Sequence, residues 1–189
     1  MAEELMKGSV FIAIKDFILK NHRAEGYARY LQSFSPEDQI LLDKKLIGVS
    51  RIPARVFAQS GELCTRLFGS GNTEYFQIVM AYVADQNINS FMKVFLRMGS
   101  PSFVMKNVPV IWKHYFYSEG TISVPSVTEK SGTVIVKGGN AYGEALCHGI
   151  IGWGTFAINF SGGKNLRVTH PECVHHGAQQ DRFEFSWDL

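Results

Sequence analysis

Residues 141–187 read AYGEALCHGIIGWGTFAINFSGGKNLRVTHPECVHHGAQQDRFEFSW, and the fold of this 189-residue chain can be worked out from this stretch. Its apolar periodicity predicts a helix over residues 142–160, and paired glycines at 162–163 predict a turn after it. Two strands should follow, over residues 166–170 and 182–187. In the second strand every other side chain is aromatic, which is typical of a strand with one buried face. The stretch therefore predicts a helix followed by a strand hairpin.

The residues before this stretch predict a helical half. Residues 1–119 place apolar side chains three and four positions apart, which is typical of amphipathic helices. At Ser35-Pro36 a hydroxyl cap, a first-turn proline and two acidic residues mark a helix start, and this helix should turn Ile40 and Leu41 inward. The predicted helices cover residues 10–21, 25–33, 36–48, 53–68, 73–84, 88–98 and 101–118.

The apolar spacing changes to two after residue 120. Short alternating runs over residues 121–124 and 133–137 predict a second hairpin. A helical half followed by strand, strand, helix, strand and strand indicates an α+β fold. We therefore predict a single domain in which the helices of residues 1–119 cover a four-stranded antiparallel sheet, formed by a ββαββ unit over residues 120–189.

The composition is that of a folded protein. Apolar residues make up 46% of the chain and aromatic residues 13%, and a net charge of +2 is spread along it without a basic stripe for nucleic acid. Apolar runs are interrupted before about 18 residues, and the N-terminal residues lack the basic start of a signal peptide. Three widely spaced cysteines do not form a disulfide framework. These features predict a soluble cytoplasmic protein with reduced thiols, no nucleic-acid partner and no transmembrane segment.

The chain lacks the motifs of the common catalytic sites. It has no nucleophile elbow, phosphate loop or nucleotide-binding fingerprint, and Gly69-Ser70-Gly71 lacks the lysine that a phosphate loop needs. Paired carboxylates such as Glu37-Asp38 lie at helix caps rather than in an acid–base arrangement. We therefore expect no enzymatic activity.

Side chains that can bind metals are concentrated in residues 141–187. They are Cys147, His148, His170, Glu172, Cys173, His175, His176 and Asp181. Two residues separate His170 from Cys173, a spacing that lets one turn present two ligands to one ion. A purely structural alternative remains open, because buried cysteines are usually packing residues and histidines near turns are usually solvated.

Several short motifs resemble those of a family of proteins of about this length and of unknown function that is expanded in myxobacteria. They are Lys7-Gly8, Val10-Phe11, Ser100-Pro101, Pro109, Trp112, Cys147, Gly152-Trp153, Gly162-Gly163, Val168, His170, Cys173, Gly177, Phe183 and Trp187. More distantly, the layout is similar to the 4-vinyl reductase domain, the haem NO-binding domain and the vesicle-tethering TRAPP subunits. The resemblance implies a helical half over a ββαββ unit that binds a small or lipidic molecule between helices and sheet, or that serves as an assembly subunit.

The resemblance also implies a metal site. In aromatic-sensing members of the 4-vinyl reductase group, one thiolate from the helix and three ligands from the following hairpin hold a zinc ion. Carried over by position, these ligands are Cys147, His170, Cys173 and Asp181. The relatives have a carboxylate and two cysteines at the three hairpin positions, so the identity of the metal is open. Four protein ligands would make the site structural rather than catalytic. Alternative ligands, or partners of the ligands, are Glu172, His175 and His176.

Haem is a second cofactor to weigh. A relative of the haem NO-binding domain would need a proximal histidine from a helix, and the candidates by segment are His22, His114 and His148. The chain lacks the accompanying tyrosine, serine and arginine signature that binds the haem propionates. The sequence therefore argues against haem.

The leading hypothesis is a ligand-binding or sensor domain that resembles the 4-vinyl reductase group. It would hold a small apolar, aromatic or lipid-like molecule between helices and sheet and pass its occupancy to a separate signalling partner. The predicted pocket residues are Phe95, Trp112, His114, Tyr115 and Trp153. The alternative is a non-catalytic adaptor or assembly subunit resembling the TRAPP proteins, in which the aromatic residues serve the core and an interface. The relatives also imply a homodimer.

Overall fold

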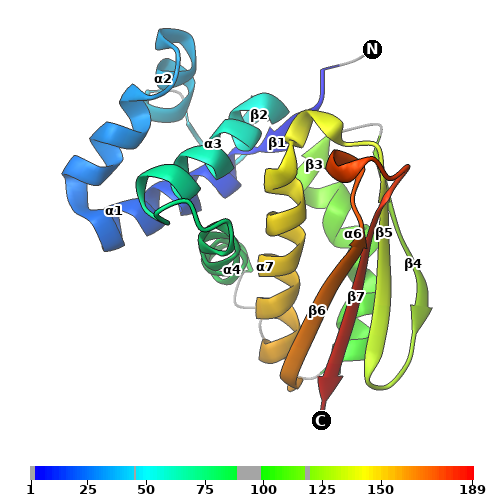
Figure 1. Cartoon of the computed structure of the whole chain (residues 1–189). Helices are drawn as coiled ribbons and strands as arrows, with labels where there is room; N and C mark the ends of the chain where they lie inside the picture. The colour runs from blue at the N-terminus through cyan, green and yellow to red at the C-terminus, as the bar shows by residue number, and fades with distance from the viewer. Residues whose placement is uncertain (1–2, 45, 89–98, 118–119) are drawn as a thin grey trace.

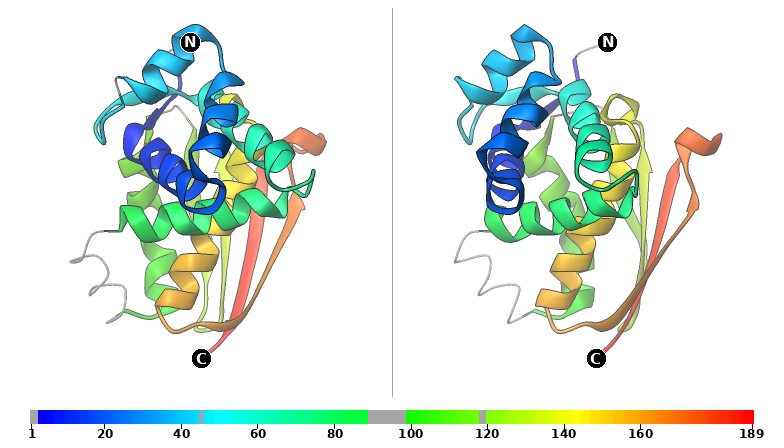
Figure 2. Two further views of the ribbon diagram at one scale, coloured as in Figure 1. Left: turned by 90° about the vertical axis from the view of Figure 1, so that its left-hand side faces the viewer. Right: turned by 60° about the vertical axis from the view of Figure 1, so that its left-hand side comes forward.

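The computed structural model describes residues 3–44, 46–88, 99–117 and 120–189. A four-stranded antiparallel sheet lies along one side of the molecule, and the helices pack on one of its faces (Figures 1 and 2). The predicted α+β fold is confirmed. The predicted helix over residues 88–98 lies outside the described residues, apart from its first residue. No described helix combines the length and apolar character needed to cross a bilayer.

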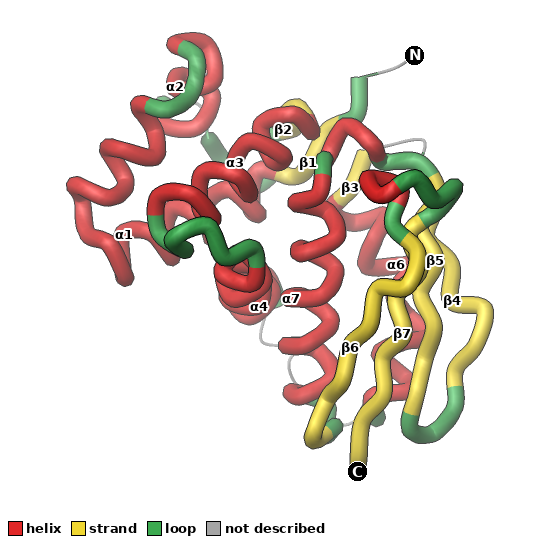
Figure 3. The backbone as a smooth tube through the Cα atoms, viewed as in Figure 1, coloured by secondary structure: helices red, strands yellow, loops and turns green. Residues whose placement is uncertain are grey.

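The helical half contains three short strands that the sequence did not predict. Its elements are β1 (Leu5–Lys7), α1 (Gly8–Gln32), α2 (Pro36–Asp43), β2 (Arg51–Pro53), α3 (Ala54–Leu67), α4 (Glu74–Asn87), α6 (Pro101–Tyr115) and β3 (Phe116–Tyr117). The strands form a small antiparallel sheet in the order β2-β1-β3 (Figure 3). Met6 in its centre pairs with Ile52 on one side and Phe116 on the other, so this sheet joins three distant parts of the chain.

Helix α1 changes direction at Arg23. The backbone angles there are φ 58° and ψ −171°, which are not helical and are strained for a residue with a side chain. The break falls between the two helices predicted over residues 10–21 and 25–33, which are therefore present as the two parts of α1. Pro109 lies inside α6, as predicted.

The second half forms the large sheet and its covering helix. Its elements are β4 (Thr121–Val127), β5 (Ser131–Lys137), the short 3-10 helix η1 (Asn140–Tyr142), α7 (Glu144–Phe160), β6 (Lys164–Glu172), the short 3-10 helix η2 (Val174–His176) and β7 (Asp181–Asp188). The strand order is β4-β5-β7-β6, with every neighbouring pair antiparallel. Both predicted hairpins are present. The aromatic alternation of β7 is confirmed, because Phe183, Phe185 and Trp187 are at most 3% exposed.

The inward face of α2 differs from the prediction. Ile40 is 43% exposed and Leu41 is only partly buried, so neither is the core residue that the spacing suggested. Leu42 and Asp38 face the interior instead, each 2% exposed. The helix is short and begins at Pro36, and its inward face combines one apolar side chain, Leu42, with the carboxylate of Asp38.

The buried carboxylate of Asp38 is fully hydrogen-bonded. The guanidinium of Arg55 on α3 donates to both of its oxygens, at 2.5 and 2.9 Å, and the Ser35 hydroxyl donates at 2.9 Å. The hydrogen bonds from Arg55 hold the pKa of the Asp38 carboxyl below its usual range. This ion pair attaches α2 to α3.

Replacing Asp38 by asparagine tests this attachment. The variant keeps the size of the side chain but removes the charge that receives two hydrogen bonds from Arg55, and we expect it to lose about 1.5–3 kcal/mol of unfolding free energy at pH 7. The matched control is Asp43→Asn, which removes a partly exposed carboxylate that pairs with Lys15 at 3.3 Å and should lose less than about 1 kcal/mol. Urea unfolding followed by circular dichroism measures the unfolding free energy of both variants. Equal losses would contradict the conclusion that the Asp38–Arg55 ion pair attaches α2 to α3.

Candidate functional site

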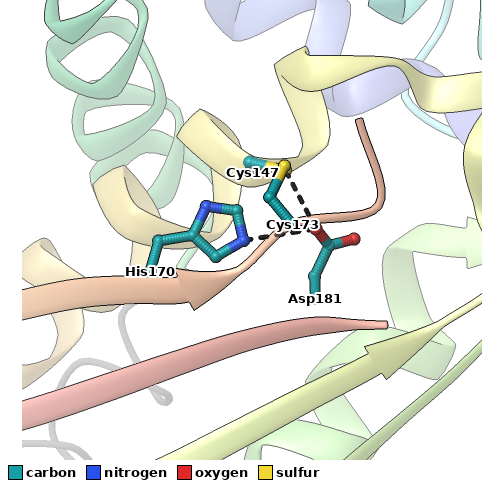
Figure 4. A group of neighbouring side chains, drawn as sticks. All are labelled: Cys147, His170, Cys173 and Asp181. Atoms are coloured by element: carbon teal, nitrogen blue, oxygen red, sulfur yellow. Dashed lines mark hydrogen bonds and ion pairs between the residues drawn. The ribbon is translucent and has the colours of Figure 1, made fainter. Parts of the chain in front are cut away.

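Four side chains that can bind a metal converge where the end of the β6–β7 hairpin meets α7 (Figure 4). Cys147 comes from the start of α7, His170 from β6, Cys173 from the residue after β6 and Asp181 from the first position of β7. Their ligand atoms all lie within 4.8 Å of one another. We call these four residues the Cys-His-Asp cluster. They are the same four positions that the resemblance to zinc-binding relatives indicated.

Asp181 is the centre of the cluster and is 1% exposed. Its Oδ1 atom accepts hydrogen bonds from the Val174 backbone N–H at 3.1 Å and the Cys147 thiol at 3.6 Å, and it lies 3.2 Å from Nε2 of His170. The His170 ring is stacked on Phe183, with 4.2 Å between ring centroids. These contacts hold the imidazole so that one nitrogen points at the carboxylate.

The electrostatics of the cluster favour a cation. Burial raises the pKa of the Cys147 thiol well above its usual range, and the neighbouring Asp181 carboxylate raises it further. The thiol is therefore neutral at pH 7 without a positive charge beside it. A bound metal ion would reverse this preference, because thiolates are the form that binds metals and the ion stabilises their charge.

The donor set suits zinc in its chemistry and in its spacing. Zinc is bound by sulfur, imidazole nitrogen and carboxylate oxygen, and four such ligands in a tetrahedron lie about 3.3–3.8 Å apart. A spread of 4.8 Å is therefore close to a binding geometry, and small movements of the four side chains would complete it. Four protein ligands would leave no open position, which makes the cluster suited to a structural role.

The alternative ligands named from the sequence are directed elsewhere. Glu172 accepts a hydrogen bond from Gln180 at 2.8 Å and lies 3.7 Å from Arg182. His175 is exposed, and His176 is exposed with its Nε2 atom 3.7 Å from Glu144. None of the three belongs to the Cys-His-Asp cluster.

A second site is an apolar cavity of about 90 Å³ between α4, α6, α7 and the large sheet. Its walls include Met80 of α4, Val134 of β5 and Phe185 of β7. On α7 the wall contains Gly149 and Gly154, and the Phe185 ring packs so closely on Gly154 that a Cβ atom there would lie 2.6 Å from it. The cavity therefore lies between helices and sheet, where the sequence predicted a ligand.

The predicted pocket residues are divided by the structure. Trp112, Tyr115 and Trp153 line the cavity. His114 does not line it, because successive residues of a helix point about 100° apart and His114 faces the exposed side of α6. Phe95 lies outside the described residues.

Other lining residues were not identified from the sequence. Met6 belongs to β1, and Met105 lies one turn into α6; both are at most 2% exposed. The alternation in β7 indicated that Phe185 is buried but not that it borders a cavity. Nothing in the local pattern around Met6 shows that β1 lies beside α6, since the strand has only three residues.

Tyr115 brings a polar group to the edge of the cavity. Its hydroxyl donates to the Asn87 backbone carbonyl at 3.3 Å, and burial raises its pKa to about 12. The phenol therefore stays protonated at physiological pH and remains a hydrogen-bond donor.

The fold is shared with solved structures, although no family model matches the chain and no curated protein matches it in sequence. An H-NOX protein from S. oneidensis in the Fe(II)NO ligation state has 12% identity and a TM-score of 0.76, over 97% of this chain and 100% of that one. An unliganded Fe(II) H-NOX protein from K. algicida has 13% identity and a TM-score of 0.75, over 97% of both chains. A structure that probes heme distortion in the H-NOX family has 13% identity and a TM-score of 0.68, over 97% of this chain and 96% of that one.

These structural neighbours correct one conclusion from the sequence. The absence of a propionate-binding signature was used as an argument against haem, and that argument is wrong, because this chain has the fold of Fe(II)-containing H-NOX proteins. The expected likeness to the haem NO-binding domain is confirmed for the fold.

The described cavity offers haem iron few ligands. No histidine or cysteine of the described residues lines it, and the lining side chains of types known to ligate haem iron are Tyr115 and the methionines Met6, Met80 and Met105. Its volume of about 90 Å³ is smaller than the roughly 300–1,000 Å³ of common ligand pockets. In this conformation the cavity does not fit a haem.

Proposed function

We propose that this chain is a small-molecule sensor domain. A small apolar molecule would bind in the cavity between α6, α7 and the sheet, and its presence would be passed to a separate partner protein. The observation that carries the proposal is the cavity itself, an apolar space of about 90 Å³ at the position where a ligand was predicted. The fold shared with H-NOX proteins supports it, because one of them, from S. oneidensis, is known in an Fe(II)NO ligation state. The adaptor alternative is not favoured by these neighbours.

The volume of the cavity limits the ligand. An engineered apolar cavity of about 150 Å³ binds benzene or xenon, so a cavity of about 90 Å³ suits xenon, a diatomic molecule or a short hydrocarbon chain. A larger aromatic molecule would need Trp112 or Trp153 to move. The proposed ligand is thus smaller than the aromatic molecule considered from the sequence.

The Cys-His-Asp cluster would serve this sensor as a structural zinc site. The ion would join the start of α7 to the β6–β7 hairpin, and so keep the cavity wall formed by α7 in place. The convergence of four ligand-type side chains within 4.8 Å supports this assignment.

Xenon binding tests the cavity. We expect xenon to cause saturable NMR shifts at the methyl groups of Met80 and Met105, and Ala157→Val to weaken this binding by at least about tenfold, because two added methyl groups occupy much of the space. The matched control is Ala84→Val, since Ala84 is equally buried on α4 but does not line the cavity. The control should bind xenon as the wild type does. Absence of saturable shifts in the wild type would refute the proposal.

Haem is the alternative occupant to test, because the structural neighbours include H-NOX proteins, although the cavity would have to enlarge to admit it. Protein produced with excess haem precursor should then show a Soret absorption band that persists through gel filtration. A protein without such a band, but with xenon binding, supports the small apolar ligand instead.

A further inference from the structure

A pair of basic side chains lies beside one end of the apolar cavity. The Lys7 Nζ atom, at the end of β1, is 2.6 Å from Nε2 of His114, near the end of α6. Both contact Tyr115, since the ammonium is 5.5 Å from the centroid of its ring and the imidazole is 4.8 Å from it. Tyr115 lines the cavity. The side chain of Tyr115 therefore lies between the Lys7–His114 pair and the cavity.

The pair has no acidic partner in the described part of the chain. The lysine ammonium donates its hydrogen bond to a neutral imidazole, which is a weaker acceptor for it than a carboxylate. Burial and the positive charge of Lys7 both lower the pKa of His114. Lys7 and His114 are thus two basic groups in contact, without a carboxylate among the described residues beside them. An anion bound next to them would be attracted by their positive charge.

We propose that the ligand of the cavity carries a carboxylate, which binds Lys7 and His114, and a short apolar chain that enters the cavity past Tyr115. The ligand class is a short-chain monocarboxylic acid. This inference rests on the proposed function and adds to it the chemical class of the ligand. The carboxylate accepts a hydrogen bond from Lys7 Nζ and one from the His114 ring, and the alkyl chain contacts residues such as Met6 and Trp112.

Butanoate and 1-butanol distinguish the two parts of this site. Butanoate has a propyl chain and 1-butanol a butyl chain, so 1-butanol buries at least as much apolar surface, but only butanoate has an anionic group. In calorimetric titrations of the whole chain we expect butanoate to bind at least about tenfold more tightly than 1-butanol. Lys7→Met should remove that advantage and leave the affinity for 1-butanol unchanged. Lys7→Arg should preserve it, because the charge remains.

Lys113→Met is the matched control for charge. Lys113 is the neighbour of His114 on α6 and is exposed, so this variant removes the same charge without removing a member of the pair. It should bind butanoate as the wild type does. His114→Gln should weaken butanoate binding, and it repeats the test should Lys7→Met fail to fold.

The pH dependence provides a second readout. His114 contacts Lys7 on β1 and the Tyr115 phenol, and Lys113 precedes it on its own helix. Because a carboxylate favours the protonated imidazole, butanoate affinity should increase as the pH is lowered from 8 to 6, while 1-butanol affinity should not. His114→Gln should abolish this increase.

Two results would overturn the inference, and they separate it from the proposed function. If butanoate binds no better than 1-butanol, or if Lys7→Met and Lys113→Met behave alike, the anionic ligand is wrong while a cavity that binds 1-butanol or xenon remains. If butanoate, 1-butanol and xenon all fail to bind, the inference and the proposed function are both wrong.

Discussion

Replacing Gly152 by alanine is expected to destabilise the protein by about 3 kcal/mol or more. Gly152 lies on α7 where it packs against α4, and within the described residues no other pair of helices shares so extensive a contact. A Cβ atom at this position would overlap the backbone carbonyl oxygen of Gln77 and lie 2.9 and 3.0 Å from its carbonyl carbon and Cα atoms. Backbone atoms of a packed helix cannot move aside as a flexible side chain can, so α7 would be pushed away from α4.

Gly149→Ala is the matched control for this prediction. Gly149 is buried on the same helix, but a Cβ atom there would lie 3.4 Å from Phe57 and 3.6 Å from Met80, which are ordinary contact distances to side chains. Alanine favours a helix by about 1 kcal/mol over glycine, so this variant should be as stable as the wild type or slightly more stable. Urea unfolding of both variants measures the difference. Equal stability changes would show that the close crossing of α4 and α7 does not limit the side chain at residue 152.

The second large effect is expected from Cys173→Ala. We expect the purified, tag-free wild-type chain to contain about one zinc ion, and this variant to lose it during purification, because removal of one thiolate ligand weakens zinc binding. Loss of the ion should also lower the unfolding free energy, by about 4 kcal/mol at a free zinc concentration 1,000-fold above the dissociation constant. Elemental analysis measures the metal, and thermal unfolding with and without a chelator measures its contribution to stability.

Cys64→Ala is the control for the loss of a buried thiol. Cys64 is 0% exposed on α3 and does not belong to the Cys-His-Asp cluster. Its variant should keep the zinc and the response to chelator, although it loses packing contacts. A wild-type chain without metal would make the cluster a hydrogen-bonded part of the core, centred on Asp181. In that case Asp181→Asn should still destabilise the protein, since Asp181 is buried and accepts several hydrogen bonds.

The local patterns in the sequence were sufficient for the large elements. The alternation of Phe183, Phe185 and Trp187 determined which face of β7 is buried, because side chains on a strand alternate between its two faces. The long helix α7 and both hairpins follow from periodicity in the same way. The four residues of the Cys-His-Asp cluster could also be named before the fold was known, although by a resemblance and not by spacing, and their convergence agrees with it.

Tertiary structure alone decided the rest. Three-residue strands such as β1 carry no periodic signal, so only the folded chain shows that Met6 borders the cavity and that Lys7 meets His114, 107 residues further along the chain. The burial of Asp38 on the inward face of α2 likewise depends on a distant partner, since Arg55 on another helix donates to both of its carboxylate oxygens. The periodicity of a segment shows which of its side chains face the core and which face solvent. It does not show which distant segment packs against it, and cavities and ion pairs are formed between such distant segments.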